Sequence, residues 1–204
     1  IVYLSGGPGG SGIGTAKWRR FPMFMAMRQF GDVIALDQRG TGASEQAEHC
    51  EAEQQLPENT DIKAQEYLAI FKAGAAFCLS HWQAQGIDIY GYNTVQNALD
   101  INDLRVHLGA DKVTLWGISY GTHLALTAVK TFPQYIDKLV LASAEGLDQT
   151  VKLPARTDAY LSRVQDVINQ QALGKQIPDL KGLMHRVHQK ASNTPFEIAL
   201  TKQD

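Results

Sequence analysis

The hexapeptide Trp116-Gly117-Ile118-Ser119-Tyr120-Gly121 decides how this chain of 204 residues is interpreted. It contains the spacing Gly-x-Ser-x-Gly, with an apolar run at 112–116 before it and a helix-compatible run at 122–129 after it. A serine on a sharp turn between a strand and a helix is a nucleophile elbow, in which the turn lifts the serine oxygen above the sheet. Glycines at 117 and 121 remove the side chains that would collide there. The pattern predicts that Ser119 is a catalytic nucleophile.

A glycine-dense loop follows the first apolar segment, residues 1–5, and complements the serine turn. Acyl transfer needs hydrogen-bond donors for the oxyanion of its tetrahedral intermediate. In an elbow, one donor is the main-chain N–H of the residue after the serine, which is Tyr120 here, and the second comes from a glycine-rich loop after an earlier strand. We therefore predict Gly7 as the second donor, with Gly6 as the nearest alternative and Pro8 as a supporting residue.

The same loop also fits the dinucleotide-binding spacing Gly-x-Gly-x-x-Gly at Gly7, Gly9 and Gly12, and Asp37 ends the next apolar segment. Asp37 lies 25 residues beyond Gly12, a little too far for the usual ribose contact, and a nucleotide site leaves the serine turn unexplained. A Walker A loop is excluded, because no Lys-Ser/Thr pair follows Gly14. We therefore keep the nucleotide site as a weaker alternative and expect no cofactor.

Short apolar segments alternate with helix-compatible ones over the first 150 residues. The expected strands are 1–5, 32–37, 112–116 and 138–143, and the expected helices are 15–30, 61–85, 94–108 and 122–131. This order predicts an α/β fold with a mainly parallel sheet and helices on both faces. After about Gly146 the strand signal stops, and residues 155–200 are expected to be helical, with polar breaks at 174–176 and 192–193.

Several polar and aromatic side chains lie near the predicted turn in sequence or in the expected fold. Asp37 and Arg39 follow the second strand and are expected to tie a loop down beside the site, rather than to act as a catalytic pair. The Tyr120 side chain is expected to line a pocket next to Ser119. Trp116 is expected to belong to the core.

Composition limits the remaining classes of function. The formal net charge of −2 gives no reason to expect nucleic acid or an anionic membrane as a partner, and no apolar stretch approaches the length of a membrane span. Cys50 and Cys78 do not form a Cys-x-x-Cys pair, so we expect no metal site. They could pair as a disulfide, which would favour a secreted or periplasmic protein, or remain free, with Cys78 buried on a helix. Their spacing leaves both possibilities open.

Three segments together resemble the α/β-hydrolase fold serine peptidases of the proline iminopeptidase and tripeptidyl aminopeptidase branch: residues 6–12, 37–44 and 117–122. Residues 92–105 are also similar to the helix that precedes the elbow in that branch, and the resemblance covers about residues 1–150. It implies a serine hydrolase that releases N-terminal residues from peptides through an acyl-enzyme at Ser119. The family's loop usually begins with histidine, where this chain has Ser5.

The resemblance also has implications for domain organisation. It implies that residues 1–148 are the N-terminal part of the hydrolase core and that residues 149–204 begin a helical cap. In secreted members a disulfide joins the positions that match Cys50 and Cys78, so pairing becomes the expectation here. We therefore suspect a periplasmic or secreted protein, while a cytoplasmic location stays open.

The rest of a catalytic triad is not evident in the sequence. In this fold the acid and the histidine follow the serine, on loops after later strands. The chain's histidines are His49, His81, His107, His123, His185 and His188. The first four precede Ser119 or lie in its own helix, and the last two lie in a polar helical stretch. We expect the chain to be part of a hydrolase, cut at both ends, that lacks the catalytic Asp and His and has little turnover alone.

Two other functions stay open. One is an esterase or other small-molecule hydrolase on the same fold, and the other is a non-catalytic binding protein on a hydrolase scaffold. The substrate is expected to be a peptide or a small ester, and the oligomeric state is not predicted. An aminopeptidase needs acids that hold the substrate's ammonium group. The nearby acids, Glu145, Asp148 and Asp158, are each expected to be surface or capping residues instead.

Overall fold

The structure is a computed structural model that describes all residues except 19, 53–63, 149–152 and 195–204. It divides into two compact units, residues 1–150 and residues 151–204.

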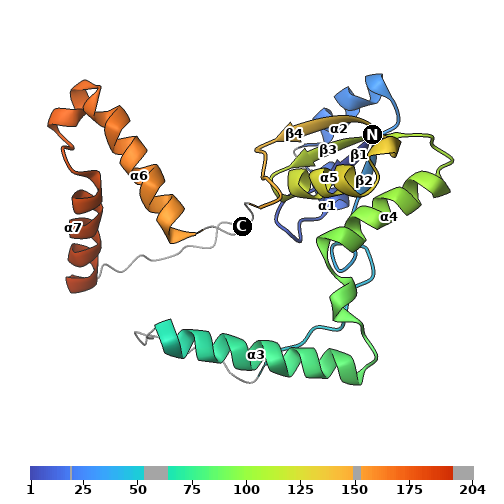
Figure 1. The fold of residues 1–204 in the computed structure, drawn as a ribbon, viewed down its shortest axis with the longest axis horizontal. Helices are drawn as coiled ribbons and strands as arrows, with labels where there is room; N and C mark the ends of the chain where they lie inside the picture. The colour runs from blue at the N-terminus through green and yellow to red at the C-terminus, as the bar shows by residue number, and fades with distance from the viewer. Residues whose placement is uncertain (19, 53–63, 149–152, 195–204) are drawn as a thin grey trace. The chain divides into compact units, whose positions relative to one another are not determined.

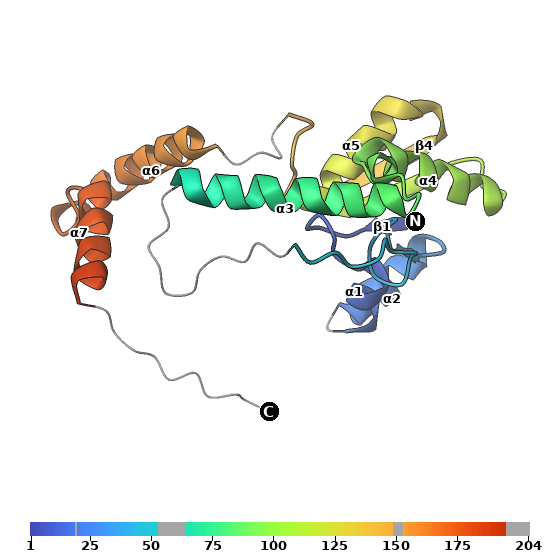
Figure 2. The same cartoon turned by 90° about the horizontal axis from the view of Figure 1, so that it is seen from below.

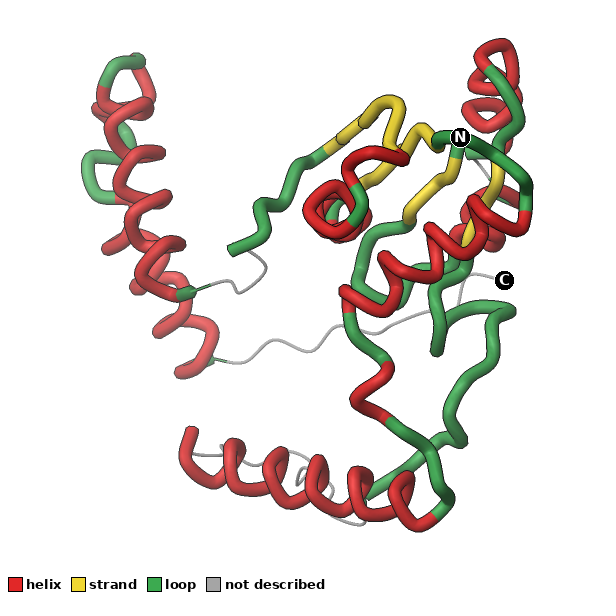
Figure 3. Tube along the Cα trace, turned by 45° about the vertical axis from the view of Figure 1, so that its right-hand side comes forward, coloured by secondary structure: helices red, strands yellow, loops and turns green. Residues whose placement is uncertain are grey.

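Four parallel strands form the sheet of the first unit, in the spatial order β2-β1-β3-β4 (Figures 1 and 3). The strands are β1 (Val2–Leu4), β2 (Ile34–Leu36), β3 (Val113–Ile118) and β4 (Ile136–Ala142). Each expected strand is present, and the predicted parallel sheet is confirmed. Because parallel strands end at the same edge, the segments after β1, β3 and β4 can meet there to build a site.

Helices cover both faces of this sheet. Helices α4 (Thr94–His107) and α5 (Tyr120–Thr131) lie on one face, and α1 (Gly12–Lys17) and α2 (Phe21–Met27) lie on the other (Figure 2). Strand β1 is buried on both sides, since its three residues are at most 1% exposed. The alternation of side chains along a strand therefore divides the core into two layers.

The larger layer contains Val2 and Leu4 of β1, which pack with Ile101 of α4 and Leu124 of α5. The smaller layer is aromatic, with Tyr3, Phe24 and Trp116 as its buried members. The three ring centroids lie 4.8–5.1 Å apart in edge-on and tilted arrangements, which are the favourable ones for aromatic pairs. The prediction that Trp116 belongs to the core is confirmed.

The first helical region differs from the single helix predicted over 15–30. Helix α1 begins earlier, because the Ser11 side chain caps it by accepting a hydrogen bond from the Gly14 N–H at 2.7 Å. A separate helix, α2, follows with Pro22 in its first turn, where proline is favourable, and a 3₁₀ turn at Arg28–Phe30 ends it. The glycine loop therefore leads directly into a helix that packs on β2.

A disulfide and a hydrogen bond link the long helix α3 (Ala64–Ala84) to residues 48–50. Cys50 and Cys78 form a disulfide with a Cα–Cα distance of 5.7 Å, so the expected pairing is confirmed. The Trp82 indole N–H adds a hydrogen bond of 2.8 Å to the Glu48 carbonyl oxygen. Two short 3₁₀ turns complete the unit, Ile89–Gly91 before α4 and Pro133–Tyr135 before β4.

The second unit is helical, as predicted for its described residues. It contains α6 (Pro154–Asn169), a 3₁₀ turn (Ala172–Lys175) and α7 (Leu180–Asn193), while the part of the prediction beyond 194 lies outside the described residues. Gln165 connects the helices, because its side chain accepts from the Leu180 N–H at 2.6 Å and donates to the Ile177 carbonyl at 3.0 Å. In the described ranges, no helix is long and apolar enough to cross a membrane.

Candidate active site

Ser119 lies on a sharp turn between β3 and α5, as the sequence pattern predicts. Its φ of 54° and ψ of −124° belong to a region that residues other than glycine rarely occupy. Main-chain contacts hold it there, because the Ser119 N–H donates to the Ala142 carbonyl at 2.9 Å. The Ser119 carbonyl accepts from the N–H and the Oγ1 of Thr122 at 2.8 and 2.7 Å. Such strain persists only where the surroundings over-determine it.

Three glycines allow the main chain to approach this turn closely. A Cβ on Gly117 would lie 2.6 Å from the Gly121 carbonyl carbon, and a Cβ on Gly121 would lie 2.7 Å from the Leu4 carbonyl carbon. A Cβ on Gly6 would lie 3.1 Å from the Cβ of Ser119. The glycine loop after β1 is therefore in contact with the serine turn after β3.

A cavity of about 720 Å³ opens beside Ser119. The residues that line it with Ser119 are Ser5, Gly6, Thr15, Trp18, Arg20 and Ile118. This places the Ser119 side chain at the wall of a space that a small substrate could enter. The lining includes Gly6 but not Gly7, the residue expected to donate to an oxyanion.

The main-chain N–H of Tyr120 is a suitable donor for that oxyanion. Tyr120 is the first residue of α5, and the first N–H groups of a helix have no partner within the helix. The N-terminal end of a helix also carries partial positive charge, which favours a developing anion. The position of Tyr120 at the start of α5 is compatible with this role, and Tyr120 and Gly7 both stay predictions for the two donors.

The Tyr120 side chain does not line the pocket, so that prediction was wrong. It is 7% exposed and belongs to the larger core layer, and its hydroxyl lies 2.9 Å from Thr94 Oγ1. Its ring stacks on His123 with centroids 5.7 Å apart. The reason is geometric: the elbow raises Ser119, and the next residue on α5 turns back toward α4.

Glu145 contacts Ser119 directly, although it was expected to be a surface or capping acid. The Ser119 hydroxyl donates a hydrogen bond of 3.1 Å to Glu145 Oε1. The main chain of the same segment is fixed to α5, because the Glu145 N–H donates to Thr122 Oγ1 at 2.8 Å. The parallel pairing of β3 with β4 brings their ends together, and this was the signal that could have identified Glu145.

Asp37 organises the loops that surround the glycine segment. It is 4% exposed, and its carboxylate accepts hydrogen bonds from the N–H groups of Ala43 and Ile13 at 2.8 and 3.0 Å and from Ser11 Oγ at 2.9 Å. Burial acts to raise the pKa of Asp37, but these hydrogen bonds outweigh it and lower the pKa below its usual value. Because its oxygens are already occupied, Asp37 is a poor ribose ligand, which weakens the dinucleotide alternative.

Arg39 does not pair with Asp37. It connects the loop after β2 to α4. Its Nε and Nη2 donate to the two carboxylate oxygens of Asp100 at 2.7 and 2.5 Å, and its Nη1 donates to the Gly91 carbonyl at 2.9 Å. The hydrogen bond to Asp100 raises the pKa of Arg39. Both Asp37 and Arg39 therefore position loops, as expected, and neither contacts Ser119.

The histidines contribute no hydrogen bond to Ser119 within the described residues. His123 lies one turn along α5, with Nδ1 3.1 Å from the Gly146 carbonyl oxygen. His185 and His188 are exposed on α7 in the second unit. Over the described ranges, no group of three or more His, Cys, Asp or Glu side chains could hold a metal ion.

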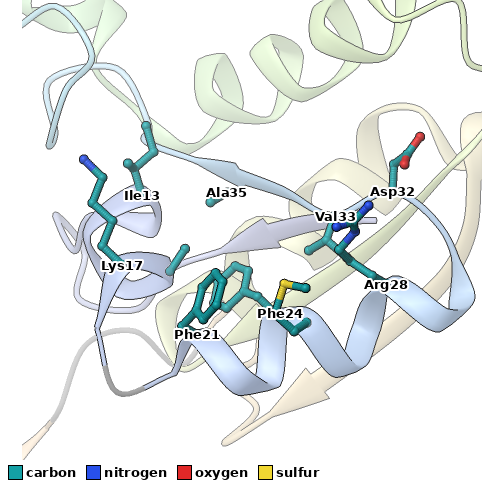
Figure 4. A pocket seen from close by; sticks show the side chains of 10 residues that line it. Ile13, Lys17, Phe21, Phe24, Arg28, Asp32, Val33 and Ala35 are labelled. Atoms are coloured by element: carbon teal, nitrogen blue, oxygen red, sulfur yellow. The ribbon is translucent and has the colours of Figure 1, made fainter.

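A second cavity, of about 670 Å³, lies between α1, α2 and β2 (Figure 4). Its walls are mainly apolar, with Phe21, Phe24 and Val33 among them, and Lys17 and Arg28 reach toward it. It contains neither the serine turn nor the glycine loop after β1. Of the two cavities, the one at Ser119 is therefore the one that borders the residues predicted from the sequence.

Comparisons with known proteins agree with this geometry. The serine protease Hip1 of Mycobacterium tuberculosis is 28% identical over 153 residues, which are 71% of this chain and 29% of that protein. The tripeptidyl aminopeptidase of Streptomyces coelicolor is 28% identical over 160 residues, 70% of this chain and 28% of that protein. A probable proline iminopeptidase of the same organism is 32% identical over 97 residues, 47% of this chain and 30% of that protein.

The chain thus spans less than a third of the length of these relatives. They include both peptidases of the branch that the three sequence segments resemble. The family described as alpha/beta hydrolase fold matches residues 1–190, which is most of the chain. Together with the parallel sheet and the serine turn after β3, this match shows that the chain belongs to the alpha/beta hydrolase fold family.

Proposed function

We propose that the protein that contains this chain is a serine hydrolase that releases N-terminal residues from peptides. The observation that carries the proposal is the strained turn that presents Ser119 at the wall of a cavity, in contact with the glycine loop after β1. Relatives named as a serine protease, a tripeptidyl aminopeptidase and a proline iminopeptidase support the peptide substrate.

In the proposed reaction, Ser119 Oγ attacks the carbonyl carbon of the scissile bond. The carbonyl oxygen becomes an oxyanion, which accepts hydrogen bonds from the Tyr120 N–H and from an N–H of the glycine loop, with Gly7 as the proposed donor. The C–N bond then breaks, and the amine leaves with the proton that the Ser119 hydroxyl gave to a general base. Water hydrolyses the acyl-enzyme, which releases the N-terminal residue and restores the Ser119 hydroxyl. Loss of one oxyanion donor typically lowers the rate by about 100- to 1,000-fold.

We infer that the histidine and the acid of a triad come from the remainder of the whole protein. The described histidines form no hydrogen bond with Ser119, and the chain spans less than a third of the length of its relatives. We further propose that residues 149–204 are the beginning of a helical cap. The Cys50–Cys78 disulfide supports a periplasmic or secreted location, because such bonds persist in oxidising compartments.

The test is a substrate panel with the full-length protein and its Ser119→Ala variant. We expect hydrolysis of alanine 4-nitroanilide, weak hydrolysis of its N-acetylated form, and loss of both activities in Ser119→Ala. Faster cleavage of short esters than of free-amine substrates would favour an esterase instead. No turnover of any substrate by the full-length protein would favour a binding function and refute the proposal.

A further inference from the structure

We propose that Glu145 binds the α-ammonium group of the substrate's N-terminal residue, so that the enzyme releases one residue at a time. This inference rests on the proposed function and specifies its substrate. It reverses the expectation from the sequence, in which Glu145 was a surface or capping acid rather than a ligand of the ammonium group.

The distance between the two side chains suits a single-residue product. Glu145 Oε1 lies 3.1 Å from Ser119 Oγ. In the acyl-enzyme of one amino acid, the ammonium nitrogen is two bonds from the carbonyl carbon that Oγ attacks, so it lies about 3 Å from Oγ. The carboxylate oxygen and that nitrogen would thus each lie about 3 Å from Oγ, and rotation about the Cα–C bond can bring them within hydrogen-bond distance of each other. In a tripeptidyl product the nitrogen is two residues farther along, about 7 Å more distant.

Hydrogen bonds through Thr122 connect the Glu145 main chain to the serine turn. Its N–H donates to Thr122 Oγ1 at 2.8 Å, and Thr122 Oγ1 in turn donates to the Ser119 carbonyl at 2.7 Å. Thr122 itself is fully buried. The Ala142 carbonyl, just before this segment, accepts from the Ser119 N–H at 2.9 Å. The carboxylate is thus prepositioned next to the reacting oxygen, which reduces the ordering cost of binding.

Its charge has no counter-ion in the described part of the chain. The salt bridges of the described residues join Arg39 to Asp100, His49 to Glu51, Lys138 to Asp137 and Lys181 to Asp158, and none includes Glu145. A half-buried carboxylate that contacts Ser119 and has no such partner therefore favours a cation from the substrate.

The experiment compares Glu145→Gln with Asp148→Asn in the full-length protein. Asp148 is an exposed acid three residues farther on, so its substitution removes the same charge without touching Ser119. Two substrates distinguish binding of the ammonium group from a role in the reaction itself. Alanine 4-nitroanilide has the ammonium group, and 4-nitrophenyl propionate lacks it. For Glu145→Gln we expect kcat/KM on the alanine substrate to fall about 10- to 100-fold, mainly through KM, as for loss of a hydrogen bond between charged groups.

On the propionate ester, Glu145→Gln is expected to match the wild type, and Asp148→Asn is expected to match it on both substrates. An equal loss on both substrates would overturn the inference, because Glu145 would then act on the reacting atoms. No loss on either substrate, or release of intact tripeptides in preference to single residues, would also overturn it. A wild-type protein that hydrolyses neither substrate would instead refute the proposed function.

Discussion

Substitution of Gly121 by alanine should disturb both the stability and the activity of the protein. Its new Cβ would lie 2.7 Å from the Leu4 carbonyl carbon and closer still to the Leu4 oxygen, whereas ordinary van der Waals contact begins at 3.4 Å. Leu4 is 1% exposed in the central strand, so its main chain cannot rotate away. We therefore expect the start of α5 to move by about 1 Å, at a cost of about 1–3 kcal/mol in the free energy of unfolding.

The same shift moves the serine turn, because Ser119 and Tyr120 stand at the start of α5. A misplacement of about 1 Å at a reacting group can lower the rate by about 100-fold. Urea denaturation measures the stability, and kcat/KM on alanine 4-nitroanilide measures the activity of the full-length protein.

The matched control is Gly91→Ala. Gly91 is half-buried, but its new Cβ would meet nothing nearer than 3.7 Å, so we expect the free energy of unfolding to change by no more than about 0.5 kcal/mol. A Gly121→Ala variant with wild-type unfolding midpoint and wild-type kcat/KM would refute the packing of α5 against β1 as described.

Three further outcomes follow from the loops that surround the site. Asp37→Asn should destabilise the protein by about 2–3 kcal/mol, because a buried N–H donor loses its acceptor. Since the folded pKa of Asp37 lies below the usual 3.8, the carboxylate stabilises the fold above that pH and ceases to do so as the pH falls through the folded pKa. The difference in the free energy of unfolding between wild type and Asp37→Asn, measured in urea, should therefore become smaller in acid. A difference that grows in acid would contradict the lowered pKa of Asp37. Arg39→Lys should lower the thermal midpoint, because lysine cannot reproduce the bidentate contact with Asp100, and an unchanged midpoint would count against that contact. The double variant Cys50→Ser/Cys78→Ser should lose about 3–4 kcal/mol of the free energy of unfolding, because the disulfide closes a loop with a sequence separation of 28. If the variant and the wild type unfold at the same denaturant concentration, the disulfide is absent.

The strands and the serine turn could be predicted because their signals are local. An apolar run, a Gly-x-Ser-x-Gly spacing and a helical run all lie within 20 residues, and each expected strand is present in the structure. Helix α1 was placed too late in the chain, because the cap at Ser11 depends on one side chain rather than on periodicity. The aromatic layer was predicted only in part, through Trp116.

The contacts within the site could not be predicted in the same way, because they join residues far apart in sequence. Asp100 is 61 residues from Arg39, and Glu145 is 26 residues from Ser119. Glu145 reaches Ser119 only because β3 and β4 pair in a particular register, with Ile118 opposite Ala142. The Tyr120 side chain was misplaced for a related reason, since its partner, Thr94, belongs to another helix.

The central claim, that Ser119 is the nucleophile, is tested most directly by covalent labelling of the full-length protein. A fluorophosphonate reacts with activated serines, and mass spectrometry of the digested protein identifies the labelled residue. We expect one labelled peptide, which contains Ser119, and no labelling in Ser119→Ala. Label on another residue, or labelling that persists at the wild-type rate in Ser119→Ala, would contradict the claim.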